Sequence, residues 1–166
     1  MAAITIRKRH AIRRSDVADL EQRLQHEIGE DARLFKSDRV EVAETDSTFQ
    51  LYLVDKKLLI FGFEGWVFPT VRGAIERPFA KRRVLVDQGA IPYVIKGADV
   101  MRPGIVSVTD DVRAGSPVVI AEQRYNKPLA IGVALLDAPA MREATKGKMC
   151  KNIHHVGDDL WNLELR

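Results

Sequence analysis

The stretch Arg83–Ile105, RVLVDQGAIPYVIKGADVMRPGI, carries the signals that decide the fold of this chain. It combines an apolar strand, an Asp-Gln-Gly turn, a short helix, a Lys-Gly-Ala turn and a Pro-Gly turn. Pro92 is tolerated only in the first turn of a helix, so the helix is expected to begin near Gly89–Ile91, later than a cap at Asp87 would imply. Gly97 occupies the position at which a left-handed residue would end this helix.

The two inner turns place basic side chains beside glycines, where a partner can approach the backbone closely. This pattern predicts a contact surface for a phosphate-rich ligand, formed by Lys96, Gly97 and Ala98 in one turn and by Arg102, Pro103 and Gly104 in the other. Glycines also close turns in small barrels that bind nothing. The residues alone leave both interpretations open.

Beyond this stretch, short strands alternate with turn residues, as is typical of a small barrel or sandwich. The expected strands are Val84–Val86, Ile105–Val108, Pro117–Gln123, Leu129–Leu136, Met149–His155 and Leu160–Leu165. A short helix is expected at Pro139–Thr145, with proline in its first turn. The helix of the opening stretch is expected to bury one face made of Ile91, Val94, Ile95 and Ala98.

The first half of the chain predicts a small α+β unit. Its basic start reads as a strand, and Ser15 is expected to cap a helix over Asp16–Ile28. Alternating residues in Val40–Phe63 predict a three-stranded antiparallel meander, which Glu64-Gly65-Trp66 is expected to break. A short helix through Glu76 should follow. The segment Arg77–Arg82 reads as a connector, so the expected domains are residues 1–80 and 81–166.

Charge adds to the prediction of a polyanion partner. The 166 residues carry a net charge of only +3, but the basic residues are clustered. Two of these clusters are expected to extend the contact surface electrostatically: Arg82, Arg83, Lys146, Lys148 and Lys151. Another basic cluster, from Arg7 to Arg14, lies at the start of the chain. Runs of this kind are also common on solvated faces that bind nothing.

The sequence argues against several other classes. Cys150 is the only cysteine, which excludes an intramolecular disulfide and fits a reducing cytoplasm. Its lysine neighbours could lower its pKa, although a small buried residue is the commoner role. Adjacent His154 and His155 point to opposite faces of a strand and cannot bind one metal together, so we expect no metal site. The paired acids Asp110-Asp111 and Asp158-Asp159 resemble turn residues and there is no phosphate-loop signature, so we also expect no cofactor and no enzyme activity. No apolar run reaches the length of roughly 20 residues that spans a bilayer. Tyr125 is a candidate for base stacking, whereas Trp161 is expected in the core.

The opening stretch also resembles the start of a PUA domain, an RNA-binding barrel, through Asp87, Gly89, Ala90, Gly97, Ala98, Met101, Pro103 and Gly104. The segment from Pro128 to Trp161 resembles the remainder of that domain through Ala130, Gly132, Gly147, Asn152, His154, Asp158 and Trp161. The segment FPTVRGAIERPF, residues 68–79, resembles the pre-PUA domain of the malignant T-cell-amplified-sequence family and its archaeal relatives. Pro92 departs from the polar or basic residue usual in the family.

This resemblance implies an α+β protein in which a pre-PUA domain precedes a PUA-like pseudobarrel. It implies a non-enzymatic, translation-linked protein that binds structured RNA, either tRNA or rRNA. The small ribosomal subunit and a protein with an initiation-factor-like domain are the partners it suggests. Two alternatives stay open: an accessory subunit of an RNA-modifying enzyme, and an adaptor that binds a protein through its first domain.

Overall fold

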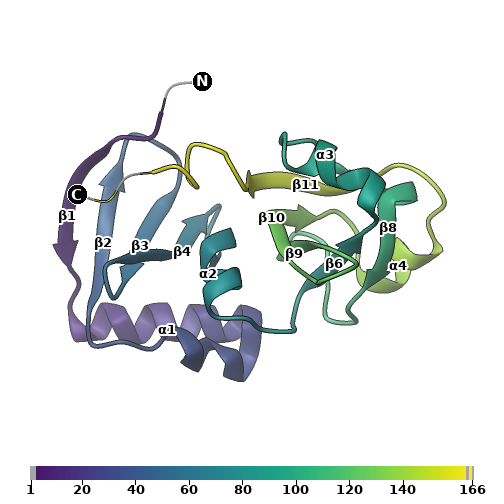
Figure 1. Ribbon diagram of the computed structural model, residues 1–166. Coiled ribbons are helices and arrows are strands. Elements are labelled where there is room, and N and C mark those ends of the chain that lie inside the picture. Colours follow the sequence, from purple (N-terminus) through teal and green to yellow (C-terminus); the bar gives the residue numbers. More distant parts are fainter. Residues whose placement is uncertain (1–2, 164, 166) are drawn as a thin grey trace. The chain divides into compact units, whose positions relative to one another are not determined.

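The computed structural model describes residues 3–163 and 165, which form two compact units of mixed helix and strand (Figure 1). The first unit contains the chain up to Phe79 together with the described residues from Asn162 onward. The second unit is Ala80–Trp161. The predicted α+β class is therefore confirmed.

The first unit is built on a five-stranded antiparallel sheet in the order β1-β2-β3-β4-β5. Its strands are β1 Ile6–Ala11, β2 Val40–Thr45, β3 Gln50–Val54, β4 Lys57–Phe63 and β5 Trp66–Pro69. The predicted meander is confirmed as β2, β3 and β4. The expected break was wrong, because Glu64 and Gly65 adopt positive φ angles of 49° and 89°. They form a tight turn that carries the meander on into β5.

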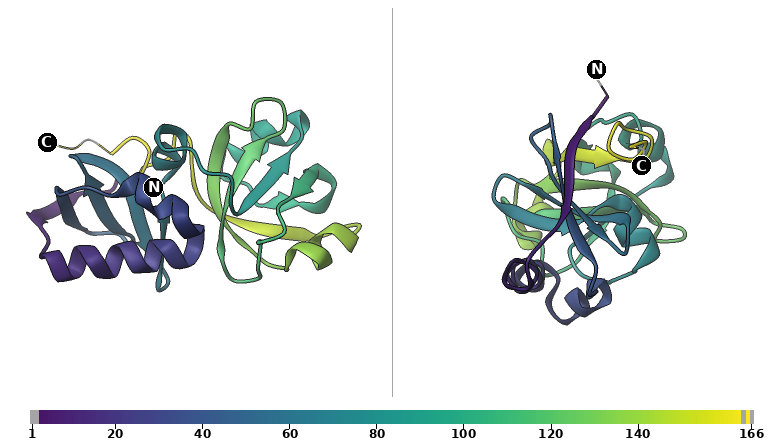
Figure 2. Two further views of the ribbon diagram at one scale, coloured as in Figure 1. Left: turned by 90° about the horizontal axis from the view of Figure 1, so that it is seen from below. Right: turned by 90° about the vertical axis from the view of Figure 1, so that its left-hand side faces the viewer.

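Helices complete the first unit. Helix α1 (Arg14–Ile28) lies along the sheet and buries Leu20, Leu24 and Ile28, as their spacing predicted (Figures 1 and 2). The cap at Ser15 was wrong, since the helix begins at Arg14 without a side-chain cap. A 3-10 helix, Gly29–Phe35, follows. Helix α2 (Val71–Glu76) is capped by Thr70, whose Oγ1 accepts a hydrogen bond from Gly73 N at 3.0 Å.

The second unit is built on a six-stranded sheet in the order β7-β11-β10-β9-β6-β8, which curls into a barrel-like form (Figure 2). Its strands are β6 Arg83–Val86, β7 Val100–Met101, β8 Ile105–Val108, β9 Pro117–Glu122, β10 Pro128–Ala134 and β11 Lys148–His155. Strands β6 and β9 are parallel, and every other neighbouring pair is antiparallel. A 3-10 turn, Arg102–Gly104, connects the edge strands β7 and β8.

One predicted strand is absent at the end of the chain. Leu160–Asn162 form turns, and Trp161 N donates to the Asp158 carboxylate at 2.8 Å, a bond that draws the chain into a turn. Leu163 has no regular structure, and residue 164 of the predicted strand lies outside the described residues. Trp161 is only half-buried, whereas Leu160 is buried.

Short helices cover the barrel: a 3-10 turn Gln88–Ala90, helix α3 Ile91–Val94 and helix α4 Ala138–Glu143. Helix α3 begins at Ile91, within the predicted range, and Asp87 caps the 3-10 turn before it by accepting a hydrogen bond from Ala90 N at 3.0 Å. The expected apolar face is confirmed for Val94, which is buried, and Ile91, which packs against the core, but was wrong for the exposed Ile95 and Ala98. Helix α3 has four residues, barely one turn, and cannot maintain a helical face that far.

No helix among the described residues combines the length and apolar character that crossing a membrane requires.

Candidate functional site

The Lys96-Gly97-Ala98 turn exposes its lysine but not its backbone donors. The N–H groups of Lys96 and Ala98 donate to Tyr93 O at 3.1 and 3.0 Å, and Gly97 N donates to Val94 O at 3.0 Å. Gly97 has a φ of 94°, and a Cβ there would lie 3.2 Å from His155 Nε2. Glycine is therefore needed for the shape of the turn. A phosphate would meet the Lys96 side chain and not these N–H groups.

The Arg102-Pro103-Gly104 turn is joined to a second basic loop. Arg102 N donates to Gly147 O at 2.8 Å, so the turn lies against Lys146-Gly147-Lys148. The Arg102 guanidinium bends back to the main chain, donating to Ile105 O at 3.3 Å and to Arg142 O at 3.2 Å. Its charge contributes to the surface, while two of its five N–H donors are used by the main chain.

Asp99 and strand β11 connect the two turns. The Asp99 carboxylate lies 2.8 Å from Lys148 Nζ and accepts a hydrogen bond from Asn152 N at 2.8 Å. The Asn152 side chain donates to Val94 O and Ala98 O, both at 3.0 Å. Burial alone would raise the pKa of Asp99, but the hydrogen bonds from Lys148 and from Asn152 N, together with the charges of Lys148 and Lys151, lower it. Asp99 is thus an ionised anchor surrounded by lysines.

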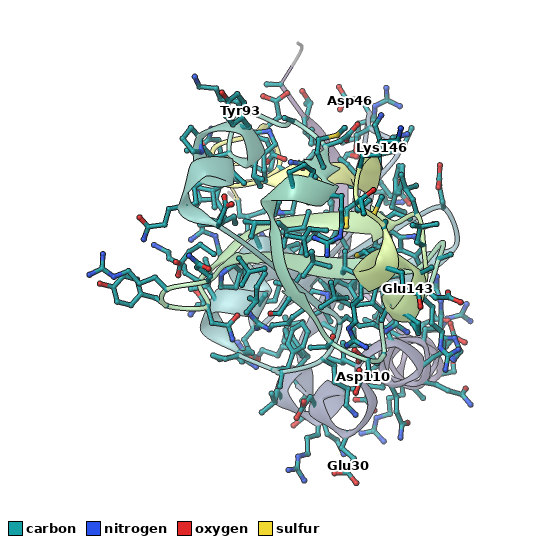
Figure 3. The ribbon with its side chains drawn as sticks, turned by 90° about the vertical axis from the view of Figure 1, so that its right-hand side faces the viewer. Glu30, Asp46, Tyr93, Asp110, Glu143 and Lys146 are labelled. Atoms are coloured by element: carbon teal, nitrogen blue, oxygen red, sulfur yellow. The ribbon has the colours of Figure 1, made fainter. Side chains whose placement is uncertain are left out.

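These contacts define a basic face along β11 and its two flanking turns. Its members are the exposed Lys96, Lys146, Lys148 and Lys151, together with the partly buried Arg102. Figure 3 shows Tyr93 and Lys146 in the upper part of that view, and the acidic Glu143 and Asp110 lower down. Two parts of the predicted surface that are far apart in sequence are therefore brought together.

A hollow of about 350 Å³ adjoins the basic face. Tyr93, Val94, Val100, Met101 and Pro103 form most of its apolar wall, and Asp87, Gly89, Ala90, Asp99 and Gly104 complete it. Tyr93 and Met101 are 68% and 49% exposed, so both lie at its mouth. The volume falls within the range of about 300–1,000 Å³ typical of small-ligand sites. Sequence reasoning missed this hollow, although Tyr93 and Met101 lay within the opening stretch.

Arg82 and Arg83 do not belong to the basic face. They are only 6% and 5% exposed, and their guanidinium groups donate to Pro117 O and Asn126 O, each at 3.3 Å. Burial also lowers the pKa of Arg83. Main-chain carbonyl groups that are distant in sequence, at the start of β9 and in the β9–β10 turn, hold both side chains in the buried part of the unit, where an RNA cannot reach them.

Other chemically notable residues have structural roles. Cys150 is buried, which was the commoner role expected for it, and burial reinforced by the Asp99 charge raises its pKa to about 12, where its lysine neighbours could have lowered it. His154 is 1% exposed, and its Nδ1 lies 2.9 Å from Asp158 Oδ2. The described residues contain no group of three or more His, Cys, Asp or Glu side chains placed to hold a metal.

Comparison with known proteins agrees with this geometry. Residues 82–156 match the PUA domain. The chain is 38% identical to an uncharacterized protein of Methanocaldococcus jannaschii, covering 96% of this chain and 98% of the relative. It is 34% identical to translation machinery-associated protein 20 of Schizosaccharomyces pombe, covering 78% and 74%. It is 31% identical to malignant T-cell-amplified sequence 1-B of Xenopus laevis, also covering 78% and 74%.

Solved structures show the same fold. A hypothetical protein from Pyrococcus horikoshii matches with a TM-score of 0.85 and 36% identity, covering 93% of this chain and 98% of that one. A conserved PUA domain protein from Thermoplasma acidophilum matches with a TM-score of 0.77 and 26% identity, covering 92% and 97%. The chain therefore belongs to the PUA-domain family that includes the malignant T-cell-amplified sequence 1 and translation machinery-associated protein 20 proteins.

Proposed function

We propose that this protein is a non-enzymatic, translation-associated RNA-binding protein that holds a structured RNA, tRNA or rRNA, on the basic face of its second unit. The PUA domain and the translation machinery-associated relatives support the general role. The observation that carries the specific proposal is that four exposed lysines gather along β11 and its flanking turns, beside an apolar hollow.

The basic face suits a phosphate backbone. Lysine ammonium groups contact phosphates as point charges, and their binding releases counterions from the nucleic acid. The ionised Asp99 neutralises part of this charge, but it also fixes the position of Lys148. The electrostatic part of binding therefore rests most on Lys96, Lys146 and Lys151. Arg102 contributes charge near the same phosphates while its guanidinium stays bonded to the main chain.

The hollow suits an unpaired nucleotide. Sequence-specific recognition of RNA favours bases that leave the stack and meet aromatic or apolar side chains. Tyr93 and Met101 offer such surfaces at the mouth, and Pro103 and Gly104 form part of the wall. An RNA end or loop would place its phosphates on the lysines and a base in the hollow. The small ribosomal subunit, or an initiation-factor-like partner, is where such an RNA would be met.

Filter binding of a tRNA transcript across a salt series tests this function. The double variant Lys96→Glu, Lys151→Glu changes two exposed lysines for which the described part of the chain shows no ion pair. The matched control, Lys36→Glu with Lys56→Glu, makes the same charge change on the first unit. Each lost phosphate contact should reduce the slope of log K against log salt by about 0.7 to 0.9, so the double variant should lose at least about 1.4. Equal affinities and slopes in both doubles would refute the proposed face.

A pull-down from lysate then separates the translation role from that of an accessory subunit of an RNA-modifying enzyme. Recovery of small-subunit ribosomal proteins supports the translation role. Recovery of an RNA-modifying enzyme, without ribosomal proteins, would instead identify the chain as an accessory subunit.

A further inference from the structure

The hairpin tip Gln123–Lys127, between β9 and β10, presents an aromatic side chain flanked by cations. All five residues of the tip are exposed, and Tyr125 is 75% exposed. The Arg124 guanidinium carbon lies 5.2 Å from the centre of the Tyr125 ring, within the range of a cation–π contact. A ring that is 75% exposed contributes little to the core and is accessible to a partner.

A buried carboxylate holds this tip from below. Glu122 is only 6% exposed and accepts hydrogen bonds from Tyr125 N at 2.6 Å, Arg124 N at 2.7 Å and Lys127 N at 3.2 Å. Burial alone would raise the pKa of Glu122, but these three donors and the Arg124 charge lower it. The carboxylate is therefore ionised, and it fixes the backbone of three of the five tip residues.

The buried Arg83 side chain fixes Asn126, a further residue of the tip. Arg83 donates to Asn126 Oδ1 at 3.0 Å and to Asn126 O at 3.3 Å, and Asn126 has the left-handed φ of 54°. Burying two charged side chains is costly unless they are hydrogen-bonded, and here both are bonded to the hairpin tip. The five tip residues are exposed, so these bonds contribute most to the shape of the tip. Tyr125 is thus presented on a preorganised loop.

The tip lies at the same end of the sheet as the Lys96 turn. Strand β10 starts at Pro128, directly after the tip, and its Ala130 pairs with His155 of β11. The ring of His155 lies against Gly97, where an added Cβ would be 3.2 Å from Nε2. An RNA strand that follows the basic face past Lys96 therefore reaches the hairpin tip next.

We propose that the β9–β10 hairpin tip is a second RNA contact, in which an unpaired base stacks on Tyr125 while Arg124 and Lys127 contact the flanking phosphates. The proposal rests on the proposed function, because it extends the footprint of the same RNA. Charge complementarity favours RNA as the occupant, because Arg124 and Lys127 are exposed cations. The acid at this turn, Glu122, is buried and bonded to the backbone. Stacking on Tyr125 does not depend on base identity, so the tip supplies affinity more than sequence preference.

The test compares Tyr125→Ala, Tyr125→Phe and the double variant Lys96→Glu, Lys151→Glu with the wild-type protein in binding to the same tRNA across a salt series. Tyr125 is exposed, so its replacement leaves the fold intact. We expect Tyr125→Ala to weaken binding about 5- to 150-fold with the salt slope unchanged, and Tyr125→Phe to bind like wild type. In RNA carrying 2-aminopurine, one position should show stacking-dependent quenching that Tyr125→Ala abolishes.

The outcomes separate the two claims. Wild-type affinity in Tyr125→Ala, with weakened binding by the lysine double variant, overturns the second contact and leaves the proposed function standing. Loss of a protein partner by Tyr125→Ala without any change in RNA binding also overturns it. Failure of the wild-type protein to bind RNA overturns both claims.

Discussion

Asp158→Ala should destabilise the second unit more than any neighbouring acid, because Asp158 holds the end of β11. Its carboxylate accepts hydrogen bonds from His155 N and Trp161 N, both at 2.8 Å, and lies 2.9 Å from His154 Nδ1. The Asp158 side chain is 13% exposed and that of His154 is 1% exposed. Removing the carboxylate leaves the partners at His154, His155 and Trp161 without an acceptor, and each buried unsatisfied donor costs about 1–3 kcal/mol, so we expect a loss of about 3–5 kcal/mol in total. In a protein of this size that corresponds to a fall in Tm of about 6–20 °C.

The cost should depend on pH in a defined direction. Burial alone would raise the pKa of Asp158, but the hydrogen bonds from His154, Trp161 and His155 lower it below its value in the unfolded chain. The stabilisation is therefore complete above the unfolded pKa of about 3.9 and is lost as the pH falls through the folded pKa. Urea unfolding of wild type, Asp158→Ala and the control Asp159→Ala at pH 7 and pH 3 measures this. A difference below about 1 kcal/mol at pH 7, or one equally large at pH 3, would refute the reasoning.

Two further predictions concern other parts of the second unit. Gly97→Ala places a side chain at a φ of 94° and 3.2 Å from His155 Nε2, so it should cost about 1–2 kcal/mol or more; an unchanged Tm by circular dichroism would contradict the strain. Cys150 is fully buried with its pKa raised to about 12, so iodoacetamide at pH 8 should modify the native protein on the order of a thousand times more slowly than the urea-unfolded chain. Comparable rates would show that the thiol is accessible.

Local sequence signals predicted most of the second unit. Strand β8 was predicted with both its limits, and the predicted limits of β9, β10 and β11 differ by at most two residues, because each strand alternates with a clear turn. The left-handed Gly97 was also predicted, because glycine is the residue that ends a helix in that conformation. The strand expected after Leu160 was wrong, since apolar residues there did not reveal the hydrogen bond of Trp161 N to Asp158.

The residues of the candidate site were harder to predict from the sequence than the strands, because their partners are distant in the chain. Arg82 and Arg83 look like a basic surface pair, but partners at Pro117 and Asn126 that lie more than 30 positions away draw them inside. The turn amides at Gly97 and Ala98 were expected to be available to a ligand, and the helix end uses them instead. Such partners depend on tertiary packing, which no local pattern encodes. Side chains whose position follows from the strand limits, Lys148 and Lys151, were placed correctly on the surface.

Crosslinking the protein to RNA in its own cells, with both the RNA and the crosslinked peptides identified, tests the central claim most directly. The account predicts a structured RNA, tRNA or rRNA, and peptides that contain Tyr93–Gly104 or Lys146–Lys151, with a further crosslink at Tyr125 if the hairpin tip is a contact. Recovery of no RNA, or of crosslinks confined to the chain before Phe79, would contradict it.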